Sequence, residues 1–109
     1  MELNEETGAI ISQDEAVMFI EAFREKFGDQ VVSSFIGRKN IEELLAQEEE
    51  GKCIGVRIYN GYNPKLERIA LIMVGVDEEG RDMLKAKLIY DDMLVCPPHC
   101  VNFGLYPRK

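Results

Sequence analysis

The chain is poor in the residues on which several common kinds of chemistry depend. Of its 109 residues three are cysteine, one is histidine and none is tryptophan. The single histidine, His99, confines any histidine-based catalytic triad to that position, and no Gly-x-Ser-x-Gly motif accompanies it. Three cysteines are too few, and odd in number, for the disulfide framework of a small secreted protein. These scarcities favour a protein without enzymatic activity.

Long apolar runs and clustered positive charge are also missing. The longest apolar run, Ile69 to Val76, is far shorter than the ~20 residues that span a bilayer. The acidic first nine residues lack the basic and apolar regions of a signal peptide. The net charge is −7, and the bases of the second half are interleaved with acids, which suits phosphate backbones poorly. We therefore expect a cytoplasmic protein that binds neither membranes nor nucleic acids.

The first half of the chain follows the helical period. Ser12 and Glu15 form a capping box, and apolar residues at helical spacing follow them. The pattern predicts a helix over about 13–27, with Gly28 ending it in the left-handed conformation.

Two shorter helices are predicted next. Asp29 is placed to cap a helix that Gly37 closes, and the apolar residues between them are at helical spacing. Asn40 is then predicted to cap a third helix, whose apolar stripe is Ile41, Leu44 and Leu45.

The second half changes to the period of two that is typical of strands. Residues 53–59 alternate, 61–64 supply turn residues, and 68–76 are apolar on both alternations. A hairpin loop is predicted at 77–80, with Gly80 available for positive φ, and a third strand at 83–90. A strand that is apolar on both sides is expected at the centre of a sheet, covered on both faces.

The predicted architecture is a single α+β domain over residues 1–109. N-terminal helices pack on one face of a three-stranded antiparallel β-meander, residues 1–11 are frayed and 91–109 form a Pro-rich tail. The other face of the central strand needs a cover. Either the tail from Met93 to Tyr106 or a second copy of the chain is expected to supply it.

The segment Cys96-Pro97-Pro98-His99-Cys100 is the most distinctive chemical feature of the sequence. Its two thiols and imidazole suit zinc, and Cys53 would then have to be the fourth ligand. The same thiols could instead close a small redox-active disulfide. A third interpretation is a stiff, extended connector with semi-buried cysteines and a surface histidine.

Three further residues are candidate ligand or interface contacts. Arg57 and Tyr59 share one face of the first predicted strand, where an arginine beside an aromatic ring suits a ligand or a partner. Arg38 precedes a predicted helix, where it would either help to hold an anion or pair with Glu42.

The order of several segments resembles a set of small bacterial proteins. The segments are Phe35–Ile41, Leu44–Gln47, Cys53–Tyr59, Leu71–Asp77 with Gly80 and Asp82, and Cys96–Cys100. The resemblance implies no activity and transfers no catalytic residue.

The combined evidence of the sequence favours a non-enzymatic interaction or binding protein that self-associates as a homodimer. The two-sided central strand motivates this hypothesis, and the protein partner, if there is another, is not specified. Two alternatives remain open: a metal-binding or thiol-redox protein, with zinc as the cofactor, and a binder of small anionic ligands.

Overall fold

The computed structural model of the chain describes residues 2–91, 93–98 and 104–105. Its contacts divide the chain into two compact units. The first unit comprises Met1–Gly8 and Ile36–Asp92 and contains a three-stranded sheet. The second comprises Ala9–Phe35 and Met93–Lys109 and contains a two-stranded sheet.

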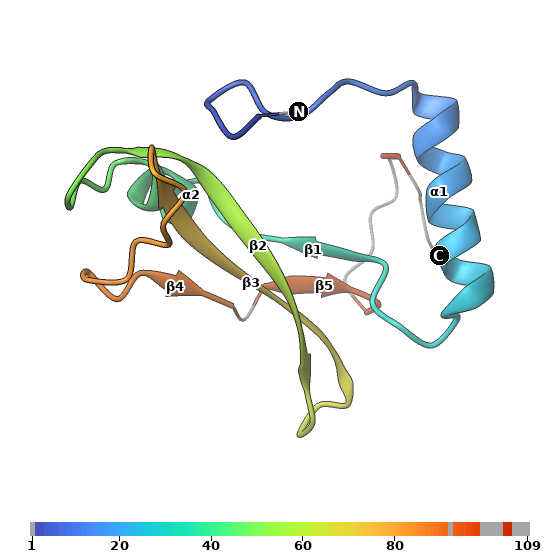
Figure 1. Ribbon diagram of the computed structural model, residues 1–109. Helices are drawn as coiled ribbons and strands as arrows, with labels where there is room; N and C mark the ends of the chain where they lie inside the picture. Colours follow the sequence, from blue (N-terminus) through green and yellow to red (C-terminus); the bar gives the residue numbers. More distant parts are fainter. Residues whose placement is uncertain (1, 92, 99–103, 106–109) are drawn as a thin grey trace. The chain divides into compact units, whose positions relative to one another are not determined.

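The fold is α+β, as predicted, and the three-stranded sheet is antiparallel with the order β2–β3–β4 of a meander (Figure 1). The elements are α1 (Gln13–Lys26), β1 (Ser33–Phe35), α2 (Arg38–Leu45), β2 (Cys53–Asn63), β3 (Arg68–Asp77), β4 (Ile89–Tyr90) and β5 (Leu94–Cys96). Within the described residues, neither helix combines the length and the apolar character that a bilayer crossing requires.

The β2–β3 ladder is the longest regular feature of the first unit. It is continuous from Gly55 opposite Val76 to Asn63 opposite Arg68. The predicted turn at 61–64 is wrong, since Gly61 and Tyr62 remain in the ladder and the turn lies at 64–67. The Asn63 side chain fixes the turn there because its Oδ1 accepts the backbone N–H groups of Lys65 at 2.9 Å and Leu66 at 3.2 Å.

The third strand is much shorter than predicted. Within the described residues, its strand pairing is limited to Ile89 and Tyr90, opposite Val74 and Met73, while Asp82 forms an isolated bridge with Val76. The preceding residues leave the sheet through a turn in which Lys87 has a positive φ of 59°. The β2–β3 ladder therefore continues beyond β4 as a two-stranded arm, residues 59–72, which is visible in Figure 1.

Helix α2 packs closely on the β3 end that lies opposite the arm's tip. An added Cβ at Gly75 would stand 2.5 Å from Gln47 Nε2 and 3.2 Å from the Leu44 carbonyl oxygen. Glycine at this position therefore permits the helix to approach the strand. The buried apolar residues of this unit are Leu44, Cys53, Val74, Val76 and Met83.

The start of α2 corrects a sequence prediction. Gly37 is its N-cap, with no side-chain cap, and the Ile41 N–H already donates to the Gly37 carbonyl. Asn40 therefore lies inside the first turn and is not the cap.

In the second unit, α1 begins as predicted and ends differently. Ser12 Oγ accepts the Glu15 N–H at 3.1 Å, which confirms the cap. At the other end, Phe27 is the C-cap with φ −131°, and its N–H donates to the Phe23 carbonyl. Gly28 does not have a positive φ, so the predicted left-handed stop is wrong.

The predicted helix between Asp29 and Gly37 is also wrong. Residues 33–35 form β1, which pairs antiparallel with β5. The β-branched pair Val31-Val32 and the serines after it favour extended chain over helix. The Val32 N–H donates to the Cys96 carbonyl at 2.7 Å, and both following X-Pro bonds, Cys96–Pro97 and Pro97–Pro98, are cis.

Substituting Gly75 tests the close approach of α2 to the sheet. We expect Gly75→Ala to lower the free energy of unfolding by about 1–3 kcal/mol, because the new methyl group overpacks the contact with Gln47 and Leu44. Chemical denaturation measures the change. Gly55→Ala is the matched control, because nothing lies within 4 Å of its added Cβ. Equal stabilities for the two variants would contradict the packing described here.

Candidate interaction site

The predicted residues Arg57 and Tyr59 are brought together by a third residue, Asp82. Arg57 Nη1 donates to Asp82 Oδ1 at 2.5 Å and to the Gly80 carbonyl oxygen at 3.2 Å. The Tyr59 hydroxyl donates to Asp82 Oδ2 at 2.5 Å. One carboxylate thus holds both side chains, and the positive charge of Arg57 is balanced within the chain.

The hydrogen bonds of Asp82 raise the pKa values of both Arg57 and Tyr59. Its hydrogen bond with Arg57 is the main cause that raises the pKa of the guanidinium. Its hydrogen bond with Tyr59 likewise raises the pKa of the phenol above the ordinary 10.0, because the carboxylate stabilises the protonated form. In the sequence Asp82 is one of several acidic residues near the hairpin loop, and no local pattern marks it as the partner of Arg57 and Tyr59. The hairpin geometry reveals its role, because the loop after β3 returns Asp82 to a position opposite Val76.

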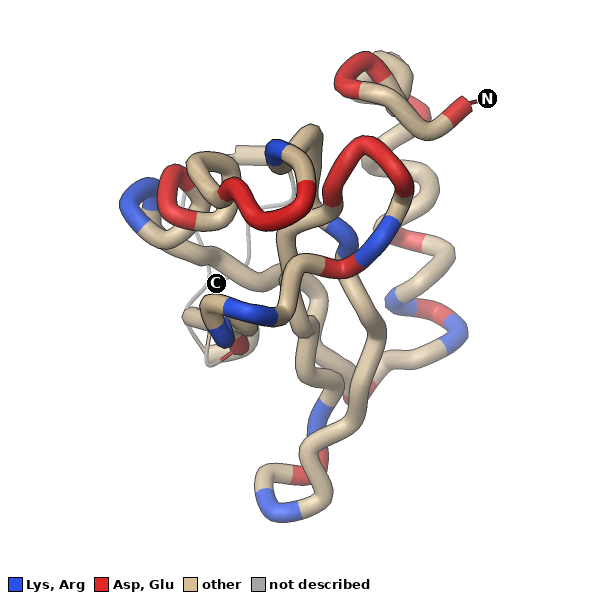
Figure 2. Tube along the Cα trace, turned by 60° about the vertical axis from the view of Figure 1, so that its left-hand side comes forward, with Lys and Arg blue, Asp and Glu red and all other residues tan. Residues whose placement is uncertain are grey.

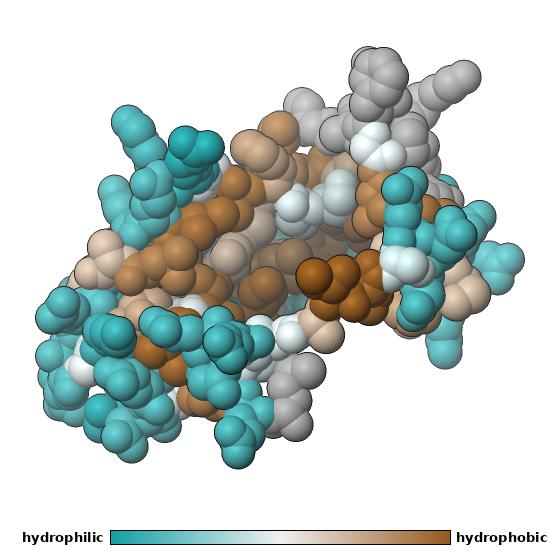
Figure 3. Space-filling model, turned by 90° about the horizontal axis from the view of Figure 1, so that it is seen from above, coloured by the Kyte–Doolittle hydropathy of each residue, from teal (hydrophilic) through white to brown (hydrophobic). Residues whose placement is uncertain are grey.

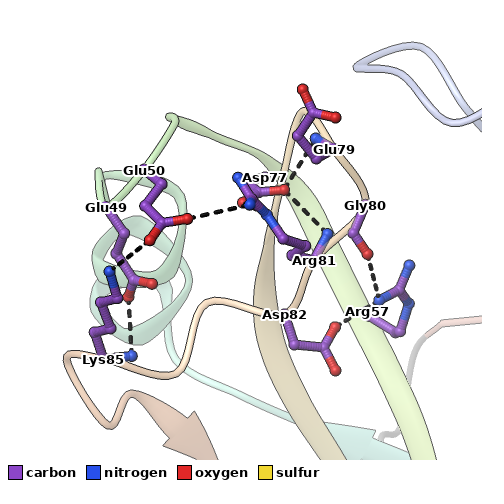
Figure 4. A network of polar contacts seen from close by, with 9 residues as sticks. All are labelled: Glu49, Glu50, Arg57, Asp77, Glu79, Gly80, Arg81, Asp82 and Lys85. Atoms are coloured by element: carbon purple, nitrogen blue, oxygen red, sulfur yellow. Dashed lines mark hydrogen bonds and ion pairs between the residues drawn. The ribbon is translucent and has the colours of Figure 1, made fainter.

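A second polar cluster holds the end of β3 (Figure 4). Asp77 is only 4% exposed, and its carboxylate accepts the backbone N–H groups of Glu79 at 2.9 Å and Arg81 at 3.0 Å. Arg81 Nε donates to the same carboxylate at 3.0 Å. The backbone N–H of Arg81 is the main cause that lowers the pKa of Asp77. The predicted positive φ of Gly80 is confirmed in this loop, at 82°.

The cluster extends from β3 to the loop that follows α2. Arg81 Nη1 lies 3.1 Å from Glu50, and Lys85 Nζ lies 3.0 Å from the other oxygen of the same carboxylate. The hydrogen bond from Lys85 is the main cause that lowers the pKa of Glu50. The Lys85 backbone N–H donates to Glu49 at 3.1 Å. These contacts join the loop after α2 to the segment that replaces most of the predicted third strand.

A cavity of about 380 Å³ lies beside the first half of β2. All five consecutive residues from Ile54 to Ile58 line it. Val76 of β3, which pairs with Gly55, lines it as well, so the cavity reaches from β2 across to β3. Its other lining residues are Leu3, Asn4, Glu5 and Thr7.

The wall opposite β2 is a hydrogen-bonded turn near the N-terminus. Asn4 N–H donates to Thr7 Oγ1 at 3.0 Å, and Glu6 N–H donates to Asn4 Oδ1 at 2.8 Å. Among the described residues no backbone hydrogen bond joins this turn to β2. Within the described residues, the outer side of β2 therefore has no strand partner.

The arm carries large apolar side chains that solvent reaches. Tyr62 is 57% exposed and Leu66 is 56% exposed, and Ile58, just before the arm, is 54% exposed. Apolar residues form part of the solvent-facing surface of the described chain, as Figure 3 shows. The central strand between β2 and β4 is buried only over Val74–Asp77 and is half-buried over residues 68–73.

The predicted zinc and disulfide residues are divided by the structure. Cys53 is buried in the first unit, and its free thiol donates to the Gly55 carbonyl at 3.1 Å. Cys96 is buried in the second unit and is disulfide-bonded. His99 and Cys100 lie outside the described residues. Across the part of the chain that is described, no three His, Cys, Asp or Glu side chains gather as a metal site would require. The zinc and redox alternatives stay predictions.

Arg38, the remaining candidate, is the first residue of α2 and is exposed. It forms no ion pair with Glu42 or any other residue among those described. Its role as an anion contact stays a prediction. Comparisons of the chain with protein-family models, with curated proteins and with solved structures found no match. The geometry of the molecule therefore carries the functional argument.

Replacing Asp82 tests the cluster on β2. In Asp82→Asn the pKa of Tyr59 should fall toward its ordinary 10.0, because the anionic acceptor is lost. Titration of tyrosine ring resonances by NMR measures it. Glu43→Gln is the control: it should lower the pKa of Tyr90, whose hydroxyl donates to Glu43, and leave Tyr59 unchanged. An unaltered Tyr59 titration in Asp82→Asn would refute the contact.

Acid titration tests the cluster on β3. The pKa values of Asp77 and Glu50 are lowered by folding from 3.8 and 4.5, so their stabilisation is full above those values and is lost as the pH falls through the lowered ones. Asp77→Asn should flatten the dependence of unfolding free energy on pH between about pH 5 and pH 2. Glu78→Gln removes one charge from the same loop and is the matched control for the change in net charge. Identical slopes for wild type and Asp77→Asn would exclude the cluster as its source.

Proposed function

We propose that the chain is a small, non-enzymatic interaction protein that self-associates as a homodimer. The observation that carries the proposal is the arm of residues 59–72, which exposes Tyr62 and Leu66 at more than half of their surface. The arm presents these apolar side chains to solvent. The polar groups of Arg57, Tyr59 and Asp82 form hydrogen bonds with one another.

The arm is a two-stranded hairpin that extends beyond the third strand of the sheet. An isolated two-stranded ribbon is marginally stable at best, and it gains stability from a third strand or from an element packed on an apolar face. Helix α2 covers the sheet near Gly75, at the end of the ladder away from the arm. Removing the exposed apolar side chains of the arm from water would contribute about 25 cal/mol for each Å² that is buried.

The distribution of charge supports a second copy as the partner. The whole chain carries −7, whereas residues 59–72 contain Lys65, Glu67 and Arg68, which sum to +1. Figure 2 shows acidic residues on the N-terminal turn and on the loops after α2 and β3, while the strands of the arm are largely uncharged. Two copies that meet at their arms therefore avoid bringing the acidic loops together.

Light scattering coupled to size-exclusion chromatography tests the proposal. At tens of micromolar the mass should be twice the 12.4 kDa of one chain. Raising the salt from about 0.05 M to about 0.5 M should strengthen the dimer, because each copy carries −7 and salt screens the repulsion. A mass of one chain at every concentration up to about 100 µM would overturn the proposal.

A further inference from the structure

We propose that the outer edge of β2 pairs antiparallel with the same edge of a second copy, so that two three-stranded sheets become one. This inference rests on the proposed self-association and adds to it the surface and the kind of contact. The partner of β2 is thus β2 itself, related by a two-fold axis.

The sheet has one long open edge. Strand β2 pairs only with β3, so within the described residues the backbone N–H and C=O groups of its outer side meet no other strand. At the other edge β4 is two residues long. A second copy that paired with the outer side of β3 would be blocked by β4, which already pairs with Met73 and Val74. The outer side of β2 has no such interruption from Gly55 to Asn63.

This edge has few of the features with which monomeric proteins protect their sheets. Exposed edge strands usually carry lysines, prolines, inward-pointing charges or bulges that prevent pairing with other chains. Strand β2 contains no lysine and no proline, and its register shift lies at its start, between Cys53 and Gly55. Beyond that point the edge is regular, and Ile58, near its middle, is 54% exposed.

The charge of β2 is compatible with pairing between two identical β2 strands. Arg57 is the one charged residue of β2, and Asp82 of the same chain already balances it. Two copies can therefore approach without an unpaired charge at the interface. Antiparallel pairing also needs no second sequence, because a two-fold axis between identical strands gives an antiparallel pair and buries the same patch on both.

The N-terminal turn does not fill the edge. It stands across the cavity of about 380 Å³ from residues 54–58, and it forms no backbone hydrogen bond with β2 among the described residues. The part of the edge from Tyr59 to Asn63 lies outside the residues that line that cavity. Within the described residues, no strand occupies the outer side of β2 along residues 59–63, where a second copy can pair.

Two lysine substitutions of similar exposure test the inference. Ile58→Lys places like charges close to the two-fold axis and should raise the dissociation constant of the dimer about tenfold or more. Ile89→Lys makes the same change on β4, where isoleucine is 53% exposed, and should leave the dissociation constant unchanged. Sedimentation equilibrium measures both, and circular dichroism verifies that both variants fold.

Hydrogen exchange on the wild-type chain gives a second readout that needs no variant. Amides of residues 55–63 should become more protected as the protein concentration rises through the dissociation constant, and those of Ile89 and Tyr90 should not. If the chain dimerises but Ile58→Lys does not change the dissociation constant, the edge contact is wrong and self-association still holds. The same conclusion follows if the protection of the β2 amides does not depend on protein concentration. A wild-type chain that is always monomeric would overturn both.

Discussion

The antiparallel ladder between β2 and β3 is the feature on which the rest of the first unit depends. It provides the strand that α2 packs against, the positions that bring Arg57 and Tyr59 to Asp82, and the loop that Asp77 closes. The ladder also extends beyond the residues of β3 that pair with β4. Where β4 ends, both strands continue as a two-stranded arm, in which Tyr62 and Leu66 are more than half exposed.

The polar clusters explain why the loops around the sheet keep their positions despite having little regular structure. Asp77 satisfies two backbone N–H groups and one guanidinium, and Glu50 links that guanidinium to Lys85. The segment after β3 is thereby held by charge-assisted contacts in place of a long strand. The side chains of these clusters therefore bind groups of their own chain.

Much of the fold could be predicted from residues that are close in the sequence. The cap at Ser12, the central strand and the positive φ of Gly80 follow from local patterns, and all three are confirmed. The segment before α2 could not be predicted in this way. Its helical spacing of apolar residues is real, but β1 forms because β5, far along the chain, offers a hydrogen-bonding partner.

The candidate site could be predicted only in part, because some of its residues are close in the sequence and one is far along the chain. Arg57 and Tyr59 stand out in the sequence because one charged residue and one phenol share a strand face. Their common partner Asp82 depends on the exact return of a hairpin loop, which a pattern of apolar residues does not specify. The third strand was overestimated because Leu84, Ala86 and Leu88 alternate as strand residues do, although the chain turns at Lys85 and Ala86.

When two copies meet along the outer edges of their β2 strands, those edges should be shielded from water. The most direct measurement is an isotope-filtered NMR experiment on a mixture of labelled and unlabelled chains, which detects only contacts between copies. The account predicts intermolecular cross-peaks between protons of residues 55–63 on both chains. Intermolecular cross-peaks that arise elsewhere and spare β2 would contradict it.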